Sequence, residues 1–461
     1  MTETPSKKLP PAAWLFRLFC QGMVRIFYRH CEVDGLDELL KPGPVLLCAN
    51  HSNALADAVI LQALSPRLIH PLARSGLFKN PLLHPFLAAI EAVPVYRRQD
   101  NTAQMKKNVD SFARVYEMLA KGEVLLIFPE GQSHSDPKLR HMKTGAARMA
   151  LGAAQHKGVT TRLLPVGMTF SHKGRFRSTV LIKFGEPIPV SPPADDHDDQ
   201  KVHALTNQLQ QGMESVTLNA DAAEELAFLH RVERFFALRH GKYRQRSLEL
   251  RFRAMKKLLQ AQRQLQEAYP VQLHNLHHHM QRFERLCSQW GIRDYQLSLE
   301  YRPGMVLKFI LRSLFTLLVI LPLGAWGIIN SLVPFLLTRK LARWISRGSD
   351  QYDTAKMVLG LVLFSIFWAL QSYWVYGHAT LAWTIVYVAS LAPSAGVALL
   401  LRRERKQIWE NLRTFFIFVR KRRVRTLLSE QRQVIEKELA HLVRLAKQEA
   451  GESRKENENR G

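Results

Sequence analysis

The residues best placed to do chemistry follow a short apolar run near the N-terminus. Val45–Ala49 is hydrophobic throughout, as in a buried strand, and Asn50 and His51 come directly after it. In an open α/β sheet, the loops at the carboxyl ends of the strands form the ligand crevice. A histidine at that edge can accept a proton near neutral pH, so His51 is a candidate general base. Asn50, beside it, is a candidate binding residue.

Asp57 is the expected partner of His51. Six positions along one regular helix would place the two side chains about 240° apart, so they could not meet on it. We therefore expect His51 in a loop, Asn53 as the N-cap of a helix over 54–64, and Asp57 reaching back from that helix. The carboxylate would fix the tautomer of the imidazole and leave its other nitrogen free. With 18 histidines in the chain, a chance His–Asp pair at this spacing is the competing interpretation.

Two adjacent arginines end another strand-like run. The sequence AVPVYRRQD predicts a strand at 92–96 that delivers Arg97 and Arg98 to the same edge of the sheet. A guanidinium group offers a fork of donors that matches a phosphate, so either arginine is a candidate phosphate ligand.

Two further stretches complete the candidate site. The sequence VLLIFPEGQS is a buried strand that turns through a proline, so that Glu130 and the amides around Gly131 face the crevice. The sequence LLPVG ends a strand with Pro165, whose ring can shape an apolar wall.

These residues depend on an α/β domain to position them. Short β-like runs alternate with amphipathic helices between positions 43 and 184, as an α/β fold requires. We expect strands at 45–49, 68–72, 92–96, 124–128, 162–169 and 180–184, and helices at 54–64, 85–91, 102–121 and 144–156.

The composition narrows the partners. The chain has 461 residues and a formal net charge of +26, which predicts an anionic partner such as phospholipid headgroups, phosphorylated substrates or nucleic acid. The four cysteines show neither a metal-ligand spacing nor a secreted framework. The run His277–His279 lacks further ligands at suitable spacing, and a solvated helix face explains it better than a metal site. We expect no metal.

Composition also changes along the chain and predicts five regions. Residues 12–28 carry arginines at helical intervals and fit a helix lying on a membrane surface or, alternatively, one packed on the following domain. The expected regions are an N-terminal amphipathic membrane-associated helix (1–42), an α/β domain (43–190), a helical subdomain (191–305), a membrane region (306–401) and a basic helical tail (402–461).

The membrane region contains long stretches without charge. Residues 313–337 and 357–401 reach spanning length, and the second breaks near Gly377 into spans at 357–376 and 380–401. With the α/β domain in the cytoplasm, three spans would place the basic connector 339–356 and the basic tail on the outer side of the membrane. Both positions would violate the positive-inside tendency. We therefore expect 313–337 to form a re-entrant hairpin bent near Pro322 and Gly324, with both termini and the α/β domain cytoplasmic. A single long tilted span is the alternative.

Taken together, NHSNALAD, VPVYRRQD, FPEGQSHSD and LLPVG resemble, in this order, the blocks of the glycerolipid acyltransferase family. The resemblance covers roughly residues 43–189. The FPEG stretch followed by Lys143 is its most specific part. The family moves an acyl chain from a thioester to a hydroxyl of glycerol phosphate or of its monoacyl derivative. The expected fold class is therefore an α/β acyltransferase domain followed by a helical subdomain and C-terminal membrane helices.

The resemblance also implies roles for the candidate residues. His51 would be the general base and Asp57 its orienting partner, Arg97 or Arg98 would bind the phosphate, and Glu130 with Gly131 would belong to the acceptor site. Pro165 would lie beside the acyl or acceptor pocket. Acyl-CoA or acyl carrier protein would supply the acyl group as co-substrate, without a cofactor, and backbone amides near His51 or Gly131 are candidate donors to the oxyanion.

Three departures from the common family pattern point to one branch. Five residues rather than the usual four lie between His51 and Asp57, the second block lacks its usual Phe-Ile, and Gln132 stands where threonine is usual. The chain is most similar to the glycerol-3-phosphate/dihydroxyacetone-phosphate acyltransferases, and lysophosphatidate is the alternative acceptor. Within this branch His134 and Lys143 are further candidates to face the phosphate.

Two other functions compete with acyl transfer. The net charge fits a membrane-tethered nucleic-acid-binding protein, but the basic run at 402–425 lies beside an apolar span, where topology and anionic lipid explain it. We therefore expect no nucleic acid partner. An inactive scaffold is the other reading, and the intact set of candidate catalytic residues argues against it.

Overall fold

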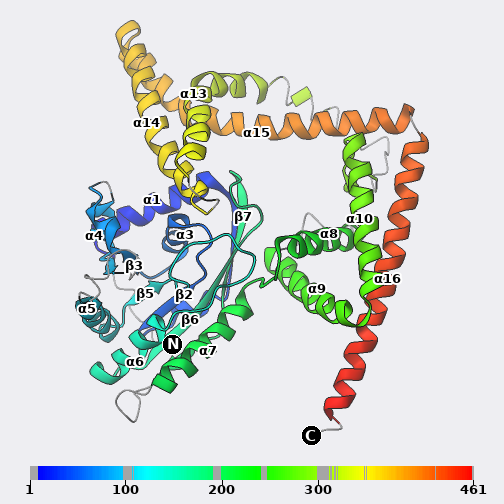
Figure 1. Cartoon of the computed structure of the whole chain (residues 1–461). Coiled ribbons are helices and arrows are strands. Elements are labelled where there is room, and N and C mark those ends of the chain that lie inside the picture. The colour runs from blue at the N-terminus through cyan, green and yellow to red at the C-terminus, as the bar shows by residue number, and fades with distance from the viewer. Residues whose placement is uncertain are drawn as a thin grey trace, which may run out of the picture. The chain divides into compact units, whose positions relative to one another are not determined.

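The structure is a computed structural model that divides into two compact units (Figure 1). It describes residues 9–81, 83–96, 106, 108–190, 199–239, 247–297, 311, 314–315, 318, 320–346, 348, 350–420 and 422–458. The first unit comprises Met1–Ala223, Ser247–Phe252 and Ala342–Met357, and we call it the α/β unit. The remainder forms the second, which we call the helical unit.

A mostly parallel sheet forms the centre of the α/β unit. Its described strands have the order β1-β7-β6-β2-β5-β3-β4, with β8 paired to β6. Only the β6 pairings with β7 and β8 are antiparallel. The strands are β1 (Tyr28–Asp34), β2 (Val45–Ala49), β3 (Ile69–Arg74), β4 (Val93–Val95), β5 (Val124–Ile127), β6 (Thr161–Phe170), β7 (Ser178–Phe184) and β8 (Ile188–Val190).

Helices cover both faces of this sheet (Figure 1). They are α1 (Pro11–Phe27), α2 (Asp37–Leu40), α3 (Leu55–Leu64), the 3₁₀ helix η1 (Ser75–Lys79), α4 (His84–Ala89), α5 (Asn108–Ala120), α6 (Gly145–Lys157) and α7 (Asp199–Val216). Helices α1 and α3 pack on one face, and α5, α6 and α7 pack on the other. Leu46 and Leu47 of β2, neighbours in sequence, enter these two separate cores, which explains why the run reads as continuously apolar.

The six predicted strands and four predicted helices are present, with shifted ends. The predicted helix at 102–121 begins at Asn108 in the described residues. Two strands, β1 and β8, were not expected. Strand β1 pairs in parallel with β7 at the edge of the sheet. Its residues are largely polar, so the sequence analysis assigned them to the N-terminal helical region. Helix α7 packs on the sheet core, so the helical unit begins later than residue 191.

The helical unit contains most residues of the other described helices, while the first residues of α9 and α14 and the last of α13 belong to the α/β unit. They are α8 (Ala223–Arg239), α9 (Leu248–Ala268), α10 (Pro270–Trp290), α11 (Asp294–Leu297), α13 (Leu321–Ile345), α14 (Tyr352–His378), α15 (Leu381–Arg420) and α16 (Arg422–Glu458). A third core joins α8, α9, α10 and α16 through residues such as Phe283, Met280 and Leu428. The basic tail therefore comprises the end of α15 and all of α16, and α16 packs on α8, α9 and α10 through an apolar stripe.

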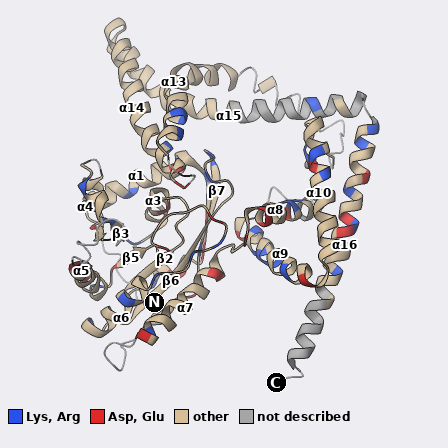
Figure 2. Cartoon of the chain, in the orientation of Figure 1, with Lys and Arg blue, Asp and Glu red and all other residues tan. Residues whose placement is uncertain are grey.

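Three helices are long and apolar enough to cross a membrane: Leu321–Ile345, Tyr352–His378 and Leu381–Leu401. In Figure 2 the ribbon of α14 is coloured for charged residues only near its start, where Asp353 and Lys356 lie. Helix α13 starts at Leu321 and runs through Pro334 without ending. Pro322 and Gly324 therefore lie in the first turn of α13, at the place where the predicted hairpin would bend. Residues 313, 316, 317 and 319 of the other predicted arm lie outside the described residues, so the re-entrant hairpin stays a prediction.

The close approach of α7 to β6 gives a stability prediction. A Cβ atom on Gly167 of β6 would lie 1.9 Å from the carbonyl oxygen of Val216 at the end of α7, and backbone cannot yield as a flexible side chain can. Gly167→Ala should therefore destabilise the protein by about 1–3 kcal/mol or more. A lowered thermal midpoint in detergent would be the measurement. Gly145→Ala, where a Cβ meets nothing within 4 Å, is the control. Equal midpoints for the two variants would refute this packing.

Candidate active site

Asp57 is the centre of the candidate site. One of its oxygens, Oδ2, accepts hydrogen bonds from His51 Nδ1 (3.1 Å), from the Ser52 amide (2.9 Å) and from the Asn53 amide (2.8 Å). Its side chain is completely buried. A carboxylate only accepts, so Nδ1 of His51 carries the proton and Nε2 is the free basic nitrogen. The structure therefore brings His51 and Asp57 together in the expected loop-to-helix arrangement.

The start of α3 differs from the prediction. Ala54, with a φ of 45°, precedes the helix, and the Asn53 side chain makes no cap hydrogen bond. Its amide group instead donates to Tyr28 and Asp353. Asp57, in the first turn of α3, accepts the backbone N–H groups of Ser52 and Asn53, which precede the helix, and carries its negative charge at the positive end of the helix. The prediction of Asn53 as N-cap is therefore wrong, because Ala54 precedes the helix and the Asn53 side chain bonds elsewhere.

The His51 ring is held on two sides. It stacks on Phe128, with ring centroids 3.9 Å apart and an angle of 17° between the planes. The side chain is 15% exposed, and within the described part of the chain Nε2 has no hydrogen-bonding partner. The imidazole thus presents one unprotonated nitrogen to the outside in a fixed orientation, as a general base must.

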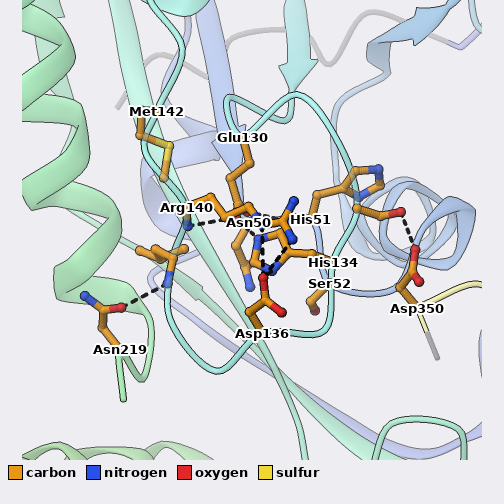
Figure 3. A network of polar contacts seen from close by, with 12 residues as sticks. Asn50, His51, Ser52, Glu130, His134, Asp136, Arg140, Met142, Asn219 and Asp350 are labelled. Carbon is orange, nitrogen blue, oxygen red and sulfur yellow. Dashed lines mark hydrogen bonds and ion pairs between the residues drawn. The ribbon is translucent and has the colours of Figure 1, made fainter. Parts of the chain in front are cut away.

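Glu130 joins the two loops of the site (Figure 3). Its Oε1 accepts the His51 amide (2.8 Å), while Oε2 accepts from the His134 ring and from the Arg140 amide (3.3 Å). The His134 amide in turn donates to the carbonyl of His51 (3.0 Å). The Glu130 side chain is completely buried. Its carboxylate therefore fixes the backbone on both sides of His51 and has no exposed oxygen to offer an acceptor.

Asn50 also faces inward. Its side-chain amide exchanges two hydrogen bonds with the backbone of Met168, at 2.7 Å and 3.2 Å, and the residue is buried. These bonds continue the β2–β6 pairing one residue past the end of β2. Asn50 therefore anchors the His51 loop to the sheet, and its polar atoms are already paired.

Gly131 and Lys143 lie against each other at the surface of the site. Gly131 has a φ of 76°, and a Cβ atom there would lie 2.5 Å from Nζ of Lys143. The Lys143 amide donates to the carbonyl of Pro129 (2.9 Å), which closes the FPEG turn. Lys143 itself is exposed. Its ammonium group is therefore a described cation beside the candidate acceptor site.

Pro165 lies inside β6, away from this group. It occurs where β6 changes its second neighbour from β8 to β7, at a position where an N–H would lack a regular partner. Its ring packs towards Gly212 of α7 and Gly185. The structure thus places Pro165 in the core between sheet and helix, which is where its apolar character is used.

The two predicted phosphate ligands, Arg97 and Arg98, lie outside the described residues.

Two residues that the sequence did not suggest, Lys173 and Tyr28, also lie near the site. The surrounding protein partly desolvates the Lys173 ammonium and lowers its pKa, although the residue remains exposed. The carboxylates of Asp57, Glu130, Asp136 and Asp350 oppose this shift. Burial, followed by Asp353 and Asp57, raises the pKa of Tyr28. Lys173 and Tyr28 follow no motif that would have identified them from sequence.

No metal centre is formed by the residues that the structure describes, since they include no group of three or more His, Cys, Asp or Glu side chains able to hold an ion. The one dense cluster of such groups is the pair of histidine–carboxylate contacts at His51–Asp57 and His134–Glu130. Both imidazoles already face a carboxylate, which suits proton transfer and positioning.

Comparison with known proteins agrees with the motifs. Residues 30–169 match the family model named Acyltransferase. The chain is 27% identical over 306 residues to an uncharacterized acyltransferase of Schizosaccharomyces pombe, covering 60% of this chain and 44% of that protein. It is 34% identical over 132 residues to glycerol-3-phosphate O-acyltransferase 1 of Saccharomyces cerevisiae, covering 27% of this chain and 17% of that protein.

A shorter bacterial protein matches over most of its length. The 1-acyl-sn-glycerol-3-phosphate acyltransferase of Bacillus subtilis is 26% identical over 180 residues, which covers 39% of this chain and 83% of that protein. The chain spans less than half of the length of either yeast relative. The resemblance to glycerolipid acyltransferases read from the sequence is confirmed.

The buried carboxylate of Glu130 gives a second stability prediction. Glu130→Gln keeps the shape but removes the charge that three donors share, and hydrogen bonds to charged groups contribute about 1.5–3 kcal/mol each. We expect a clearly lowered thermal midpoint in detergent. Asp136→Asn is the control, because Asp136 pairs with Arg140 and His134 at the surface, where such pairs contribute about 0–1 kcal/mol. A Glu130→Gln midpoint no lower than that of the control would contradict the bridging role.

Proposed function

We propose that this chain, whose residues 30–169 belong to the acyltransferase family, transfers an acyl group from a thioester to a hydroxyl of glycerol-3-phosphate or dihydroxyacetone phosphate. The observation that carries the proposal is the contact of His51 Nδ1 with the buried Asp57 carboxylate, which leaves Nε2 unpaired in the described structure. A hydroxyl is a poor nucleophile until a base removes its proton, and a positioned histidine contributes about 10²–10⁴ in rate.

The reaction needs no acyl-enzyme. The acceptor hydroxyl gives its proton to Nε2 of His51 while its oxygen attacks the thioester carbonyl carbon. The tetrahedral intermediate then collapses, the carbon–sulfur bond breaks, and the departing thiolate takes the proton back from His51. Asp57 stays ionised and stabilises the imidazolium that exists between these steps. The products are an ester and a free thiol, so atoms and charges balance without a cofactor.

The amides first considered as oxyanion donors already have acceptors. Those of Ser52 and Asn53 donate to Asp57, that of His51 donates to Glu130, and that of Gly131 donates to the carbonyl of Phe128. A developing oxyanion has to find a different donor, because each of these N–H groups already stabilises the loop that carries His51.

Cations would bind the phosphate of the acceptor. We propose Lys143 and Lys173 for this role together with Arg97 or Arg98, because the two lysines are exposed and lie near the carboxylates of the site. Asn50 and Glu130 would then act through the His51 loop and not through the acceptor, since their polar atoms are paired within the protein. The acyl donor would be acyl-CoA or acyl carrier protein.

Lysophosphatidate is the second candidate acceptor. It is favoured by the similarity to the B. subtilis protein, which the match covers over 83% of its length. The two acceptors differ by one acyl chain and share the phosphate and a glycerol hydroxyl, so the same base and the same cations serve both. The distinction therefore rests on whether an apolar surface accommodates that chain.

The activity would take place at a membrane, with the α/β unit in the cytoplasm. Asp353, in the first turn of α14, bonds to Asn53 in the α/β unit, so this end of α14 lies on the same side as that unit. Residues 199–297 precede α13 and contain no described helix able to span. We propose that the chain returns to the cytoplasmic side before α14, that α14 and α15 are the two spans, and that the basic tail contacts anionic lipid.

An acyl-transfer assay tests the function. Purified protein would be offered glycerol-3-phosphate, dihydroxyacetone phosphate and lysophosphatidate with both thioester carriers. We expect transfer to the first or second acceptor, complete loss in His51→Ala, and a loss of about two or more orders of magnitude in Asp57→Asn, whose carboxamide cannot stabilise the imidazolium. Wild-type turnover in His51→Ala would refute the mechanism, and preference for lysophosphatidate would establish the second candidate.

Labelling of single cysteines tests the topology. In a background without the four native cysteines, Ala379→Cys, between α14 and α15, should react with an impermeant thiol reagent added outside sealed cells. Ser349→Cys and Ser453→Cys should react only after the membrane is opened. The Ala379 variant serves as the positive control, and labelling of either serine position from outside would overturn the two-span arrangement.

A further inference from the structure

The chain segment that leads into α14 makes close contacts with the loops of the candidate active site. This segment, residues 350–357, belongs to the α/β unit although it lies some 300 positions from His51 in sequence. Asp350 accepts a hydrogen bond from Ser133, just after the FPEG turn (Figure 3). Met357 packs with Met23 of α1 and Ala56 of α3. The start of the first proposed span is thus part of the site's own structure.

Two residues of this segment hold Asn53. Asp353 Oδ2 accepts from the Asn53 side-chain amide at 3.1 Å, and the Thr354 hydroxyl donates to the Asn53 carbonyl at 3.4 Å. The same hydroxyl accepts from the Ala56 amide at 3.3 Å. Asn53 is 1% exposed, and its own backbone amide donates to Asp57. A continuous set of hydrogen bonds therefore runs from Asp353 through Asn53 to Asp57 and His51.

A buried ion pair fixes Asp353 itself. Lys356 donates to Asp353 Oδ1 at 3.2 Å and to the Gly174 carbonyl, and its ammonium lies 3.8 Å from the centroid of the Tyr352 ring. The Gly174 amide donates to Asp353 Oδ2 at 3.0 Å. Both charged side chains are at most 10% exposed. Because every charged atom here has a partner, the pair favours one arrangement over all others.

The residue after Asn53 shows why such a hold is needed. Ala54 has a φ of 45° and a ψ of −129°, outside the regions that a residue with a Cβ prefers. Backbone strain of this kind costs about 1–3 kcal/mol and persists only where surrounding contacts enforce it. Asp353 and Thr354 form hydrogen bonds with Asn53, before Ala54, and Thr354 also accepts one from Ala56, after it. The strained turn at Ala54 directs the Asp57 carboxylate towards His51.

We infer that Asp353 is a positioning residue: through Asn53 it holds the strained turn that presents Asp57 to His51. The inference rests on the proposed function for its catalytic consequence. Lys356 supports Asp353 by charge, and Thr354 supports the same turn by two hydrogen bonds. The catalytic loop is thereby built from two distant parts of the chain.

If α14 spans the membrane as proposed, this arrangement also limits how far the site can lie from the membrane. Asp353 lies four residues before Met357, where a run without charged residues begins, and four helical residues span about 6 Å. With α14 as the first proposed span, the Asn53–Asp353 bond would hold the His51 loop near the boundary between headgroups and acyl chains. Phosphorylated acceptors reach that depth from water, and the acylated product can leave into the bilayer.

Four variants test the inference: Asp353→Asn, Asn53→Leu, the two combined, and Asp353→Asn with Lys356→Met, which leaves no unpaired buried charge. Asp34→Asn is the matched control, since it removes an Asp–Lys pair with Lys183 elsewhere in the same unit. For each, kcat and both KM values are measured on monodisperse protein. The rate at which diethyl pyrocarbonate modifies His51 is read by peptide mass spectrometry.

We expect kcat to fall about tenfold or more in the four test variants, with both KM values within about twofold of wild type. The combined Asp353→Asn and Asn53→Leu variant should lose no more kcat than the worse of the two single variants, because both changes break the same hydrogen bond. His51 should be modified at least about threefold faster, because its ring is held less firmly. The control should match wild type in both readouts.

Wild-type kcat and modification rate in Asp353→Asn with Lys356→Met would overturn the inference, and so would fully additive losses. If wild-type protein acylates no acceptor, the proposed function fails by itself. The modification rates then still decide whether Asp353 positions His51.

Discussion

A single carboxylate oxygen determines the geometry of this site. Oδ2 of Asp57 accepts three N–H groups, two from the backbone and one from His51, inside a side chain that is completely buried. An ionised carboxylate is costly to bury unless donors surround it, so these three bonds and the start of α3 form together or not at all. The result is a loop whose backbone cannot shift without exposing a charge to an apolar core. That rigidity is what allows one imidazole nitrogen to be aimed at a substrate.

The remaining polar residues of the motifs act on the same loop from other directions. Asn50 ties its beginning to β6, and Glu130 takes the amide of His51 while holding His134. The motif residues therefore divide into an inward group that fixes the base and an outward group of cations, such as Lys143, that is free to meet a phosphate. We expect acceptor choice to depend on the outward group, because the carboxylates and the amide of the inward group are buried inside the protein.

Sequence predicted the local parts well and the long-range parts poorly. Val45–Ala49 and Val124–Ile127 were predictable because buried parallel strands read as unbroken apolar runs. Helix geometry required His51 to lie outside the helix that carries Asp57, and so predicted the loop-to-helix arrangement of the pair. Asn53 was predicted to be a helix N-cap because its residue type and position allowed it. In the structure its side-chain amide instead donates hydrogen bonds to Tyr28 and Asp353. No local pattern reveals a contact between residues 53 and 353. Strand β1 was missed since an edge strand tolerates the polar residues that it carries.

The central claim is that His51 acts as a general base on the acceptor hydroxyl and never carries the acyl group. Thiol release after rapid mixing of the protein with an acyl thioester tests this most directly, with and without glycerol-3-phosphate. The account predicts that thiol appears only when the acceptor is present, in equal amount to the ester formed, and that no acyl group remains on the denatured protein. A burst of one thiol per protein without acceptor, with the acyl group retained on the chain, would contradict it.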